Sequence, residues 1–366
     1  MKFKKLLTFA VVAITSIALI GCAAIKKEDS KKETSSITKT DDNVLYVYNW
    51  GDYIDPSLIT KFEKETGITV KYDVYDTNEI MYQKLKSGNV HYDIIFPSDY
   101  MVQKMIHENM LEKIDTSKLK YYNEIDSKFK NLAYDPKNEY SVPYTWGTVG
   151  IMYNKKMVKE PVDSWNILWD PKYKDNVIMV DSPRDAIGIA LKKLGYSLNS
   201  TNPEQLKEAR DQLIKQKNSG MIRAYMVDEV KDAMASGEAA LSVAWSGDAV
   251  TMMDMNPDLG FALPKEGSNK WFDAICIPKN APNIENAYKF IDFLCEPENA
   301  AINAEYIGYS TPNKGALKIL PNEITENPVV YPADDKLKNF EVFTDIGKNA
   351  TKELDQIWVE VKAARK

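Results

Sequence analysis

The sequence predicts an α/β fold built from two successive units. Short apolar runs typical of strands alternate with amphipathic stretches typical of helices, and this alternation begins again in the middle of the chain. In the first unit the order is strand, helix, strand, helix, strand, helix, over residues 44–48, 55–67, 68–74, 79–87, 92–97 and 98–109. An order of this kind calls for a mostly parallel sheet covered by helices.

The second unit repeats the mixture of strands and helices after a turn-rich stretch. Its strands and helices are expected over 177–180, 182–194, 203–217, 240–245 and 260–263. The two α/β units therefore span about 44–150 and 151–271. A third region contains helices only, expected near 284–294, 297–306, 334–346 and 349–365.

The beginning of the chain has the three parts of a secretion signal. Three lysines precede an uncharged apolar run over residues 6–20, which is shorter than the roughly 20 residues of a membrane-spanning helix. The run ends in Leu19-Ile20-Gly21-Cys22, which resembles a bacterial lipobox whose cysteine carries a lipid. The other interpretation is a plain signal peptide with an incidental cysteine.

A lipobox makes residues 1–21 a lipoprotein signal peptide and Cys22 the lipidated first residue of the mature chain. Residues 22–43 are rich in Lys, Glu, Asp, Ser and Thr, so they cannot bury enough surface to fold and are expected to form a flexible tether. We therefore expect an exported protein anchored to the outer face of the cell membrane, which is the periplasmic side in a Gram-negative cell.

Charge and cysteine content exclude some classes of protein. The formal charge of −6 becomes −9 once the three signal lysines are removed (−6 minus 3), which argues against a nucleic-acid partner. Export would permit a disulfide between Cys276 and Cys295. However, Cys276 lies in an apolar run and Cys295 ends an amphipathic helix, so two buried thiols are the favoured interpretation.

Aromatic and acidic residues follow the predicted strands, where open α/β sheets bind their ligands. The groups are Asn49–Tyr53, Pro97–Tyr100, Asp181–Asp185, Ala244–Asp248 and Trp271–Asp273. An isolated tryptophan of this kind is more often a core residue, and an isolated acid is often a helix cap. Five such groups at equivalent places favour a binding site between the two units.

An alkylammonium ligand fits this combination of residues. A primary amine is charged at neutral pH, so each enclosed nitrogen needs a carboxylate. Aromatic faces pack against the methylene groups and also attract the cation. A sugar site would also use tryptophan and acids, so the aromatic residues alone do not separate the two ligand classes.

Enzymatic and metal-binding motifs are absent from the sequence. A glycoside hydrolase would need two positioned carboxylates, and no acid is marked as catalytic by its pattern. There is no G-x-S-x-G, H-E-x-x-H or P-loop motif. His91 and His107 are too far apart for a helical metal pair, so we expect neither a metal nor a cofactor.

Seven stretches in a fixed order carry a family resemblance. They are Leu45–Trp50 with Tyr53, Phe62–Gly67, Tyr92–Tyr100, Ser141–Gly147, Leu194–Ser197, Trp271–Asp273 and Ile307–Asn313. Together they resemble the periplasmic spermidine/putrescine-binding proteins of polyamine ABC transporters, and the likeness covers essentially all of residues 44–366.

The resemblance implies a two-lobe periplasmic-binding-protein-like fold of type II, with a ligand cleft between lobes joined by a hinge. Lobe 1 would comprise residues 44–150 and 272–317, and lobe 2 would comprise 151–271 and 318–366. The ligand contacts that agree with the family in residue type are Trp50, Tyr53, Ser98, Tyr100, Trp245, Trp271, Asp273 and Tyr309.

Four residues at three places in the chain depart from the family pattern. Ser182 and Asp185 stand where the family has Asp and Glu, and Asp181, one residue earlier, is a candidate to compensate. Asp52 shortens a family glutamate, and Phe343 replaces a glutamine. Fewer and shorter acids are expected to change which polyamine fits, because each ligand nitrogen needs its own partner.

The function implied by the resemblance is capture of spermidine or putrescine and delivery to an ABC importer. The expected partners are the polyamine, the permease subunits and, through Cys22, the membrane, and the protein is expected to be a monomer. A binding protein for another cation or a sugar-like solute is the main alternative. A surface protein for adhesion or sensing and a secreted glycoside hydrolase are more remote ones.

Overall fold

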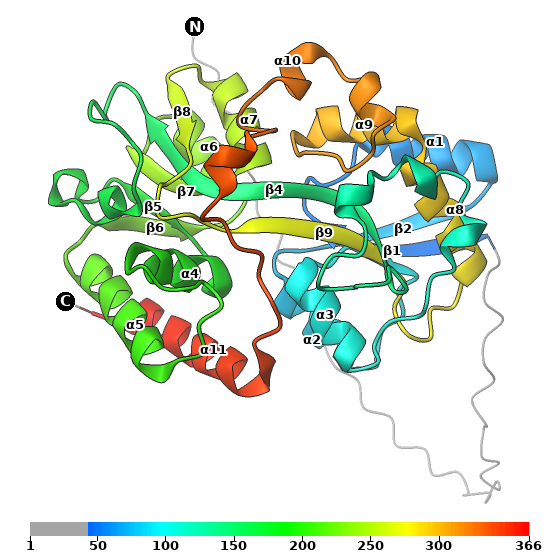
Figure 1. Ribbon diagram of the computed structural model, residues 1–366, viewed down its shortest axis with the longest axis horizontal. Coiled ribbons are helices and arrows are strands. Elements are labelled where there is room, and N and C mark those ends of the chain that lie inside the picture. The colour runs from blue at the N-terminus through cyan, green and yellow to red at the C-terminus, as the bar shows by residue number, and fades with distance from the viewer. Residues whose placement is uncertain (1–42, 366) are drawn as a thin grey trace, which may run out of the picture. The chain divides into compact units, whose positions relative to one another are not determined.

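A mixed sheet of nine strands runs through the structure, a computed structural model that describes residues 43–365. The strand order is β2-β1-β3-β9-β4-β7-β5-β6. Strand β8 lies outside this order and pairs with β4. Figure 1 shows β4 and β9 crossing the middle, between groups of elements at either end. The strands are β1 (Val44–Trp50), β2 (Thr69–Tyr75), β3 (Ile94–Ile95), β4 (Ser141–Asn154), β5 (Val177–Val180), β6 (Ile222–Met226), β7 (Leu241–Trp245), β8 (Leu259–Ala262) and β9 (Lys270–Cys276).

The sheet is parallel at its ends and antiparallel in its centre. Strand β1 pairs in parallel with β2 and β3, and β5 pairs in parallel with β6 and β7. Strand β9 is antiparallel to β3 and β4, and β4 is antiparallel to β7 and β8. The prediction of a mostly parallel sheet is therefore wrong for the centre, because β4 and β9 run antiparallel to their neighbours and belong to neither βαβ unit.

Strand β4 connects the two ends of the sheet. Its first part, Ser141–Thr148, pairs with β9, and its second part, Val149–Asn154, pairs with β7 and β8. All of its residues except Tyr153 are buried, so the strand shows no alternation of apolar and polar residues. Pro143, Gly147 and Gly150 also weaken its strand signal, which explains why periodicity does not reveal it.

Helices at the β1 end begin and end at the capping residues that the sequence indicates. The Asp55 side chain accepts a hydrogen bond from the backbone N–H of Ser57 at 2.7 Å, and Gly67, with a φ of 72°, ends the first helix. The helices at this end are α1 (Pro56–Thr66), α2 (Asn78–Lys86), α3 (Asp99–His107), α8 (Ile284–Cys295), α9 (Pro297–Ile307) and the short α10 (Asn322–Thr325).

Helices at the other end surround strands β5 to β8. Ser182 caps the first of them and accepts a hydrogen bond from the backbone N–H of Asp185. Helix α5 and the C-terminal helix pack together beside α4 (Figure 1). These helices are α4 (Pro183–Lys193), α5 (Pro203–Asn218), α6 (Val230–Ala235), α7 (Ser246–Met255) and α11 (Gly347–Ala363).

The helix expected over 334–346 is wrong. Only Asp334–Leu337 forms a 3-10 turn, and the chain then continues without helical structure. The backbone of Glu341 instead accepts from Lys270 N–H at 2.9 Å and donates to Ser268 O at 2.9 Å. Tertiary hydrogen bonds therefore override a helix-like spacing of apolar residues, and they bring Phe343 to the interior.

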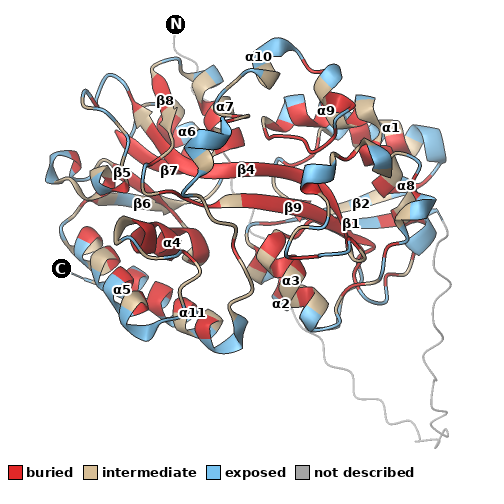
Figure 2. Cartoon of the chain, in the orientation of Figure 1, coloured by how far each residue is buried: buried red, intermediate tan, exposed pale blue. Residues whose placement is uncertain are grey.

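The largest hydrophobic core follows β4 and β9, which Figure 2 shows as almost continuously buried. Trp165 is fully buried, and Trp169 packs against the same core. Cys276 and Cys295 are both buried and both free, which confirms the expectation of two buried thiols.

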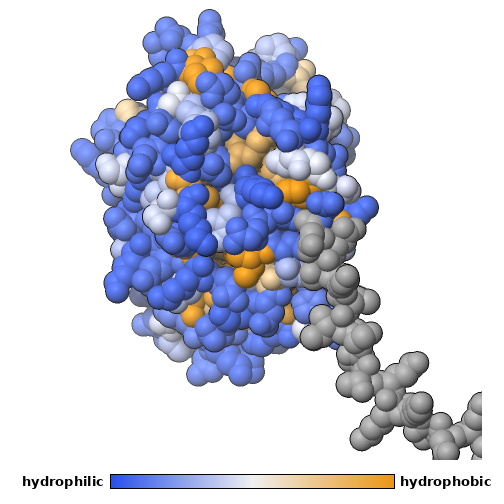
Figure 3. Space-filling model, turned by 90° about the vertical axis from the view of Figure 1, so that its right-hand side faces the viewer, coloured by the Kyte–Doolittle hydropathy of each residue, from blue (hydrophilic) through white to orange (hydrophobic). Residues whose placement is uncertain are grey.

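The face that Figure 3 presents is mainly hydrophilic, with apolar side chains in small separate groups. Among residues 43–365, no helix has the length and apolar character needed to cross a membrane. The signal peptide over 1–21, the lipobox cysteine Cys22 and nearly all of the tether lie outside the described residues.

Candidate ligand-binding site

One cavity of about 110 Å³ lies where the strands β1, β5, β7 and β9 and the first turns of α2 and α3 come together. The structure brings to this cavity every ligand-binding residue that the sequence suggested, although their role as contacts stays a prediction. These residues are Trp50, Asp52, Tyr53, Ser98, Tyr100, Asp181, Ser182, Asp185, Trp245, Trp271, Asp273, Tyr309 and Phe343.

Asp273 is a buried carboxylate with one oxygen unused. The Tyr53 hydroxyl donates to its Oδ2 at 2.7 Å, whereas its Oδ1 has no hydrogen-bond partner within the described part of the chain. Burial raises the pKa of Asp273 to about 7. Because a buried unpaired carboxylate is costly, this oxygen is suited to receive a cationic donor from a ligand.

Asp185 repeats this arrangement on helix α4. The Ser182 hydroxyl donates to its Oδ2 at 2.8 Å, and its Oδ1 is buried without a partner among residues 43–365. Burial raises the pKa of Asp185 to about 6. The charges of Asp185 and Asp273 also repel each other across the cavity. Two separate carboxylates can thus each accept one positive group.

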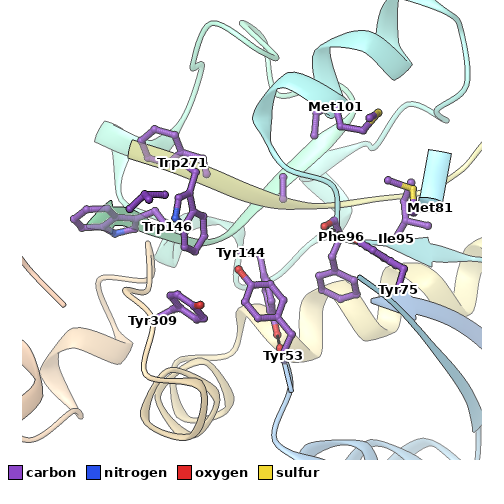
Figure 4. Packing of buried hydrophobic residues seen from close by; sticks show 14 of the residues in the cluster. Tyr53, Tyr75, Met81, Ile95, Phe96, Met101, Tyr144, Trp146, Trp271 and Tyr309 are labelled. Atoms are coloured by element: carbon purple, nitrogen blue, oxygen red, sulfur yellow. Dashed lines mark hydrogen bonds between the residues drawn. The ribbon is translucent and has the colours of Figure 1, made fainter. Parts of the chain in front are cut away.

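Aromatic rings form the apolar walls of the cavity. Trp271 meets Tyr309 edge to face with ring centroids 5.1 Å apart, and Tyr309 meets Tyr53 in the same way at 5.6 Å. Figure 4 shows these three side chains facing a common space. The Trp50 indole is fixed by donating its N–H to Phe96 O at 2.8 Å. Such walls suit methylene groups and, through their faces, cations.

Two glycines make room for the aromatic walls. A Cβ on Gly147 of β4 would lie 2.5 Å from Cζ2 of Trp271. A Cβ on Gly247 of α7 would lie 2.5 Å from the ring of Tyr309. Only glycine therefore fits at these two positions while both rings keep their places, and sequence reasoning had not identified either residue.

Two of the suggested acids already have cationic partners in the protein. Lys362 binds Asp181 at 2.7 Å, and the indole N–H of Trp358 donates to the same carboxylate at 3.1 Å. Asp181 therefore does not cap the helix, since the cap is Ser182. Asp52 forms an ion pair with Lys231 at 3.0 Å.

Asp99, which the sequence allowed as a helix cap, is fully buried and structural. Its carboxylate accepts from the backbone N–H of Tyr100 at 2.7 Å and from that of Phe272 at 3.0 Å. It thus fixes the start of α3 against β9. Ser98 occupies the N-cap position without a side-chain cap bond, and its hydroxyl accepts from Asn78 at 3.0 Å.

Arg184 forms the wall beside Phe343. Its guanidinium lies 5.0 Å from the ring centre of Tyr100 and 4.4 Å from that of Phe343, and it donates to Asn199 Oδ1 at 3.1 Å and to Thr344 O at 3.3 Å. Phe343 therefore provides an aromatic surface for the guanidinium of Arg184.

Sequence reasoning also missed several polar residues of the cavity. Asp248 follows Trp245 in α7, and burial raises its pKa to about 6 even though the nearby Lys231 ammonium lowers it. Glu79 accepts from the Tyr100 hydroxyl at 2.9 Å. Asp248 belongs to the group Ala244–Asp248 that follows a predicted strand, so its position in the sequence could have identified it as a cavity residue. Within residues 43–365, no cluster of His, Cys, Asp and Glu could hold a metal.

Comparisons with known proteins agree with this architecture. Residues 57–332 match the family model for bacterial extracellular solute-binding proteins. The spermidine/putrescine-binding periplasmic protein of Escherichia coli is 39% identical over 327 residues, which cover 89% of this chain and 93% of that protein.

Two solved structures extend the likeness to the fold. A Listeria monocytogenes protein, provisionally named a spermidine/putrescine ABC transporter, superposes with a TM-score of 0.85 at 47% identity, covering 88% of this chain and 99% of that one. The Tp0655 (TpPotD) lipoprotein of Treponema pallidum gives 0.77 at 31% identity, with 87% and 99% covered. The predicted periplasmic-binding-protein-like α/β fold is confirmed, and the chain belongs to the family of bacterial extracellular solute-binding proteins.

Proposed function

We propose that this chain captures a polyamine, spermidine or putrescine, outside the cell and delivers it to an ABC importer. The observation that carries the proposal is the pair of buried carboxylate oxygens, Asp273 Oδ1 and Asp185 Oδ1, that have no partner within the described chain and line a cavity with aromatic walls. Ammonium groups match these oxygens in charge and in hydrogen bonding. The names of the relatives support the same ligand class.

The proposed ligand contacts divide into three groups. Asp185 and Asp273 bind the ammonium groups, while the aromatic residues Trp50, Trp245 and Trp271 contact the methylene chain. The remaining predicted residues complete the walls, and they are Asp52, Tyr53, Ser98, Tyr100, Asp181, Ser182, Tyr309 and Phe343. Asp52 and Asp181 contribute less to ligand affinity, since each is neutralised by a lysine.

Delivery is proposed to depend on closure of two lobes around the ligand. The lobes comprise 44–150 with 272–317 and 151–271 with 318–366, so that two of the crossings lie within β4 and β9. Because Leu320 and Ile324 pack against α9, we move the third passage of the chain between lobes from residues 317–318 to a point after α10. A ligand that contacts both lobes only in the closed state shifts the equilibrium toward closure.

The proposed location follows from the N-terminal sequence. Lipidation of Cys22 would hold the protein at the outer face of the membrane, and residues 22–43 would give it reach toward the permease subunits. A lipoprotein among its structural relatives supports this anchor. We propose that the protein acts as a monomer and as a binding protein without catalytic activity, in keeping with its family.

A calorimetric titration tests the ligand class. The form that begins at residue 23 would be unfolded and refolded to remove bound ligand, then titrated with putrescine, cadaverine, spermidine, spermine and glucose. We expect one-to-one binding of a diamine or a triamine and no binding of glucose or of butane-1,4-diol, the uncharged analogue of putrescine. Binding of glucose without any binding of amines would contradict the proposal.

A further inference from the structure

Lys231 lies at the edge of the cavity between carboxylates from both ends of the sheet. Its ammonium is 3.0 Å from Asp52, which follows β1, and 3.9 Å from Asp228, which precedes α6. Its side chain is only 15% exposed, so the lysine is held in the wall and does not extend into solvent. This contact joins segments that are far apart in the sheet order.

A third carboxylate shares the charge of Lys231. Burial lowers the pKa of Lys231, but attraction by Asp248 and by Asp52 and Asp228 outweighs it, so the pKa is raised and the lysine stays protonated. Asp52, Asp228 and Asp248 all line the cavity, whereas Lys231 is not among the lining residues. The single positive charge of the ammonium therefore offsets part of the negative charge of these three carboxylates.

Two other acids of the cavity differ in this respect. Asp185 and Asp273 each keep a buried oxygen without a partner in the described chain. The guanidinium of Arg184, which lies near Asp185, donates its hydrogen bonds to Asn199 and to Thr344 O. The cavity thus offers two carboxylates, Asp185 and Asp273, that each keep an oxygen free for a ligand cation, whereas Asp52, Asp228 and Asp248 already share a lysine.

We propose that Lys231 is a specificity-determining residue that offsets part of the negative charge of Asp52, Asp228 and Asp248 and thereby favours ligands with two ammonium groups over ligands with three. A third ammonium would have to share these carboxylates with the lysine and would be repelled by it. The proposal rests on the proposed polyamine-binding function and adds to it a preference for diamines.

The test compares Lys231→Met with the control variant Lys156→Met. The affinities of each variant for putrescine and for spermidine would be measured by calorimetry. We expect Lys231→Met to shift the ratio of affinities toward spermidine by about tenfold or more, because a third ammonium gains a partly buried carboxylate partner. Lys156→Met removes the same charge from an ion pair with Asp258 that lies outside the cavity, and it should leave the ratio unchanged.

A second substitution keeps the test informative. Adding Asp248→Asn to Lys231→Met should reduce the gain for spermidine, since one of the three freed carboxylates is lost. An unchanged ratio in Lys231→Met, or an equal shift in Lys156→Met, would overturn the proposal. Lys231→Gln replaces Lys231→Met if the methionine variant fails to fold, as judged by its melting temperature. Failure of the wild-type protein to bind any amine would instead overturn the proposed function itself.

Discussion

Asp273→Asn is expected to weaken polyamine binding by about 2–5 kcal/mol, because an ammonium in a closed cavity would lose its charged partner. The substitution keeps the size of the side chain and the possibility of accepting from Tyr53, which donates to Asp273 at 2.7 Å. Calorimetric titration of both proteins with the preferred polyamine measures the difference. Wild-type affinity in the variant would remove Asp273 from the site.

The pH dependence of ligand binding shows whether Asp273→Asn weakens binding by removing the negative charge of residue 273 or by changing the shape of the cavity. Because burial raises the pKa of Asp273 to about 7, part of the ligand-free protein carries this group protonated near neutral pH. An ammonium favours the ionised form, so wild-type affinity should fall as pH is lowered from about 8 to about 6, with a shallower fall in Asp273→Asn. Asp163→Asn, an exposed acid that pairs with Lys265, serves as the control and should behave as wild type.

Gly147→Ala is expected to reduce both stability and ligand affinity. Its new Cβ would lie 2.5 Å from Trp271 Cζ2 and 2.7 Å from Ser246 Oγ, so the indole must move. Overpacking of this kind destabilises proteins by about 1–3 kcal/mol. Displacement of the aromatic wall should further weaken ligand binding by about 1 kcal/mol or more. Denaturant unfolding and calorimetry measure the two effects separately.

Gly150→Ala is the matched control for this prediction. It lies on the same strand, and its Cβ would approach Phe261 to 2.4 Å, but neither residue lines the cavity. A similar loss of stability with unchanged ligand affinity is therefore expected for Gly150→Ala. Equal losses of affinity in the two variants would show that general distortion of β4, and not the position of Trp271, controls binding.

Local sequence signals predicted many of the elements at both ends of the sheet, although β6, α6 and α7 were not among them. Asp55, Pro56 and Gly67 define α1 because caps and a left-handed glycine act within a few residues. The short strands β1 and β5 are apolar runs of ordinary length. Signals of this kind do not depend on distant parts of the chain, and the observed bounds therefore lie close to the predicted ones.

The elements that sequence reasoning missed depend on distant contacts. Strand β4 is buried almost throughout and contains Pro143 and Gly147, so neither periodicity nor composition identifies it. The segment over 334–346 has the spacing of a helix, yet Glu341 is tied to Ser268 and Lys270 by backbone hydrogen bonds. Contacts with distant parts of the chain determine the secondary structure of both segments, and no local sequence pattern indicates those contacts.

The candidate site was predictable in its residue types but not in its charge balance. Strand-end position alone places Trp50, Asp185 and Asp273 at one cavity. That Asp181 is neutralised by Lys362, and Asp52 by Lys231, follows only from side chains that meet in the folded chain. Counting acids in the sequence therefore overestimates the number of ammonium groups that the site can bind.

The most direct test of the account is a crystal structure of the ligand-free protein after addition of putrescine. We predict one nitrogen within about 2.7–3.2 Å of Asp273 Oδ1 and the other at a similar distance from Asp185 Oδ1, with the methylene chain against Trp271. A bound putrescine whose nitrogens contact neither carboxylate would contradict the central claim that these two unpaired oxygens hold the ligand.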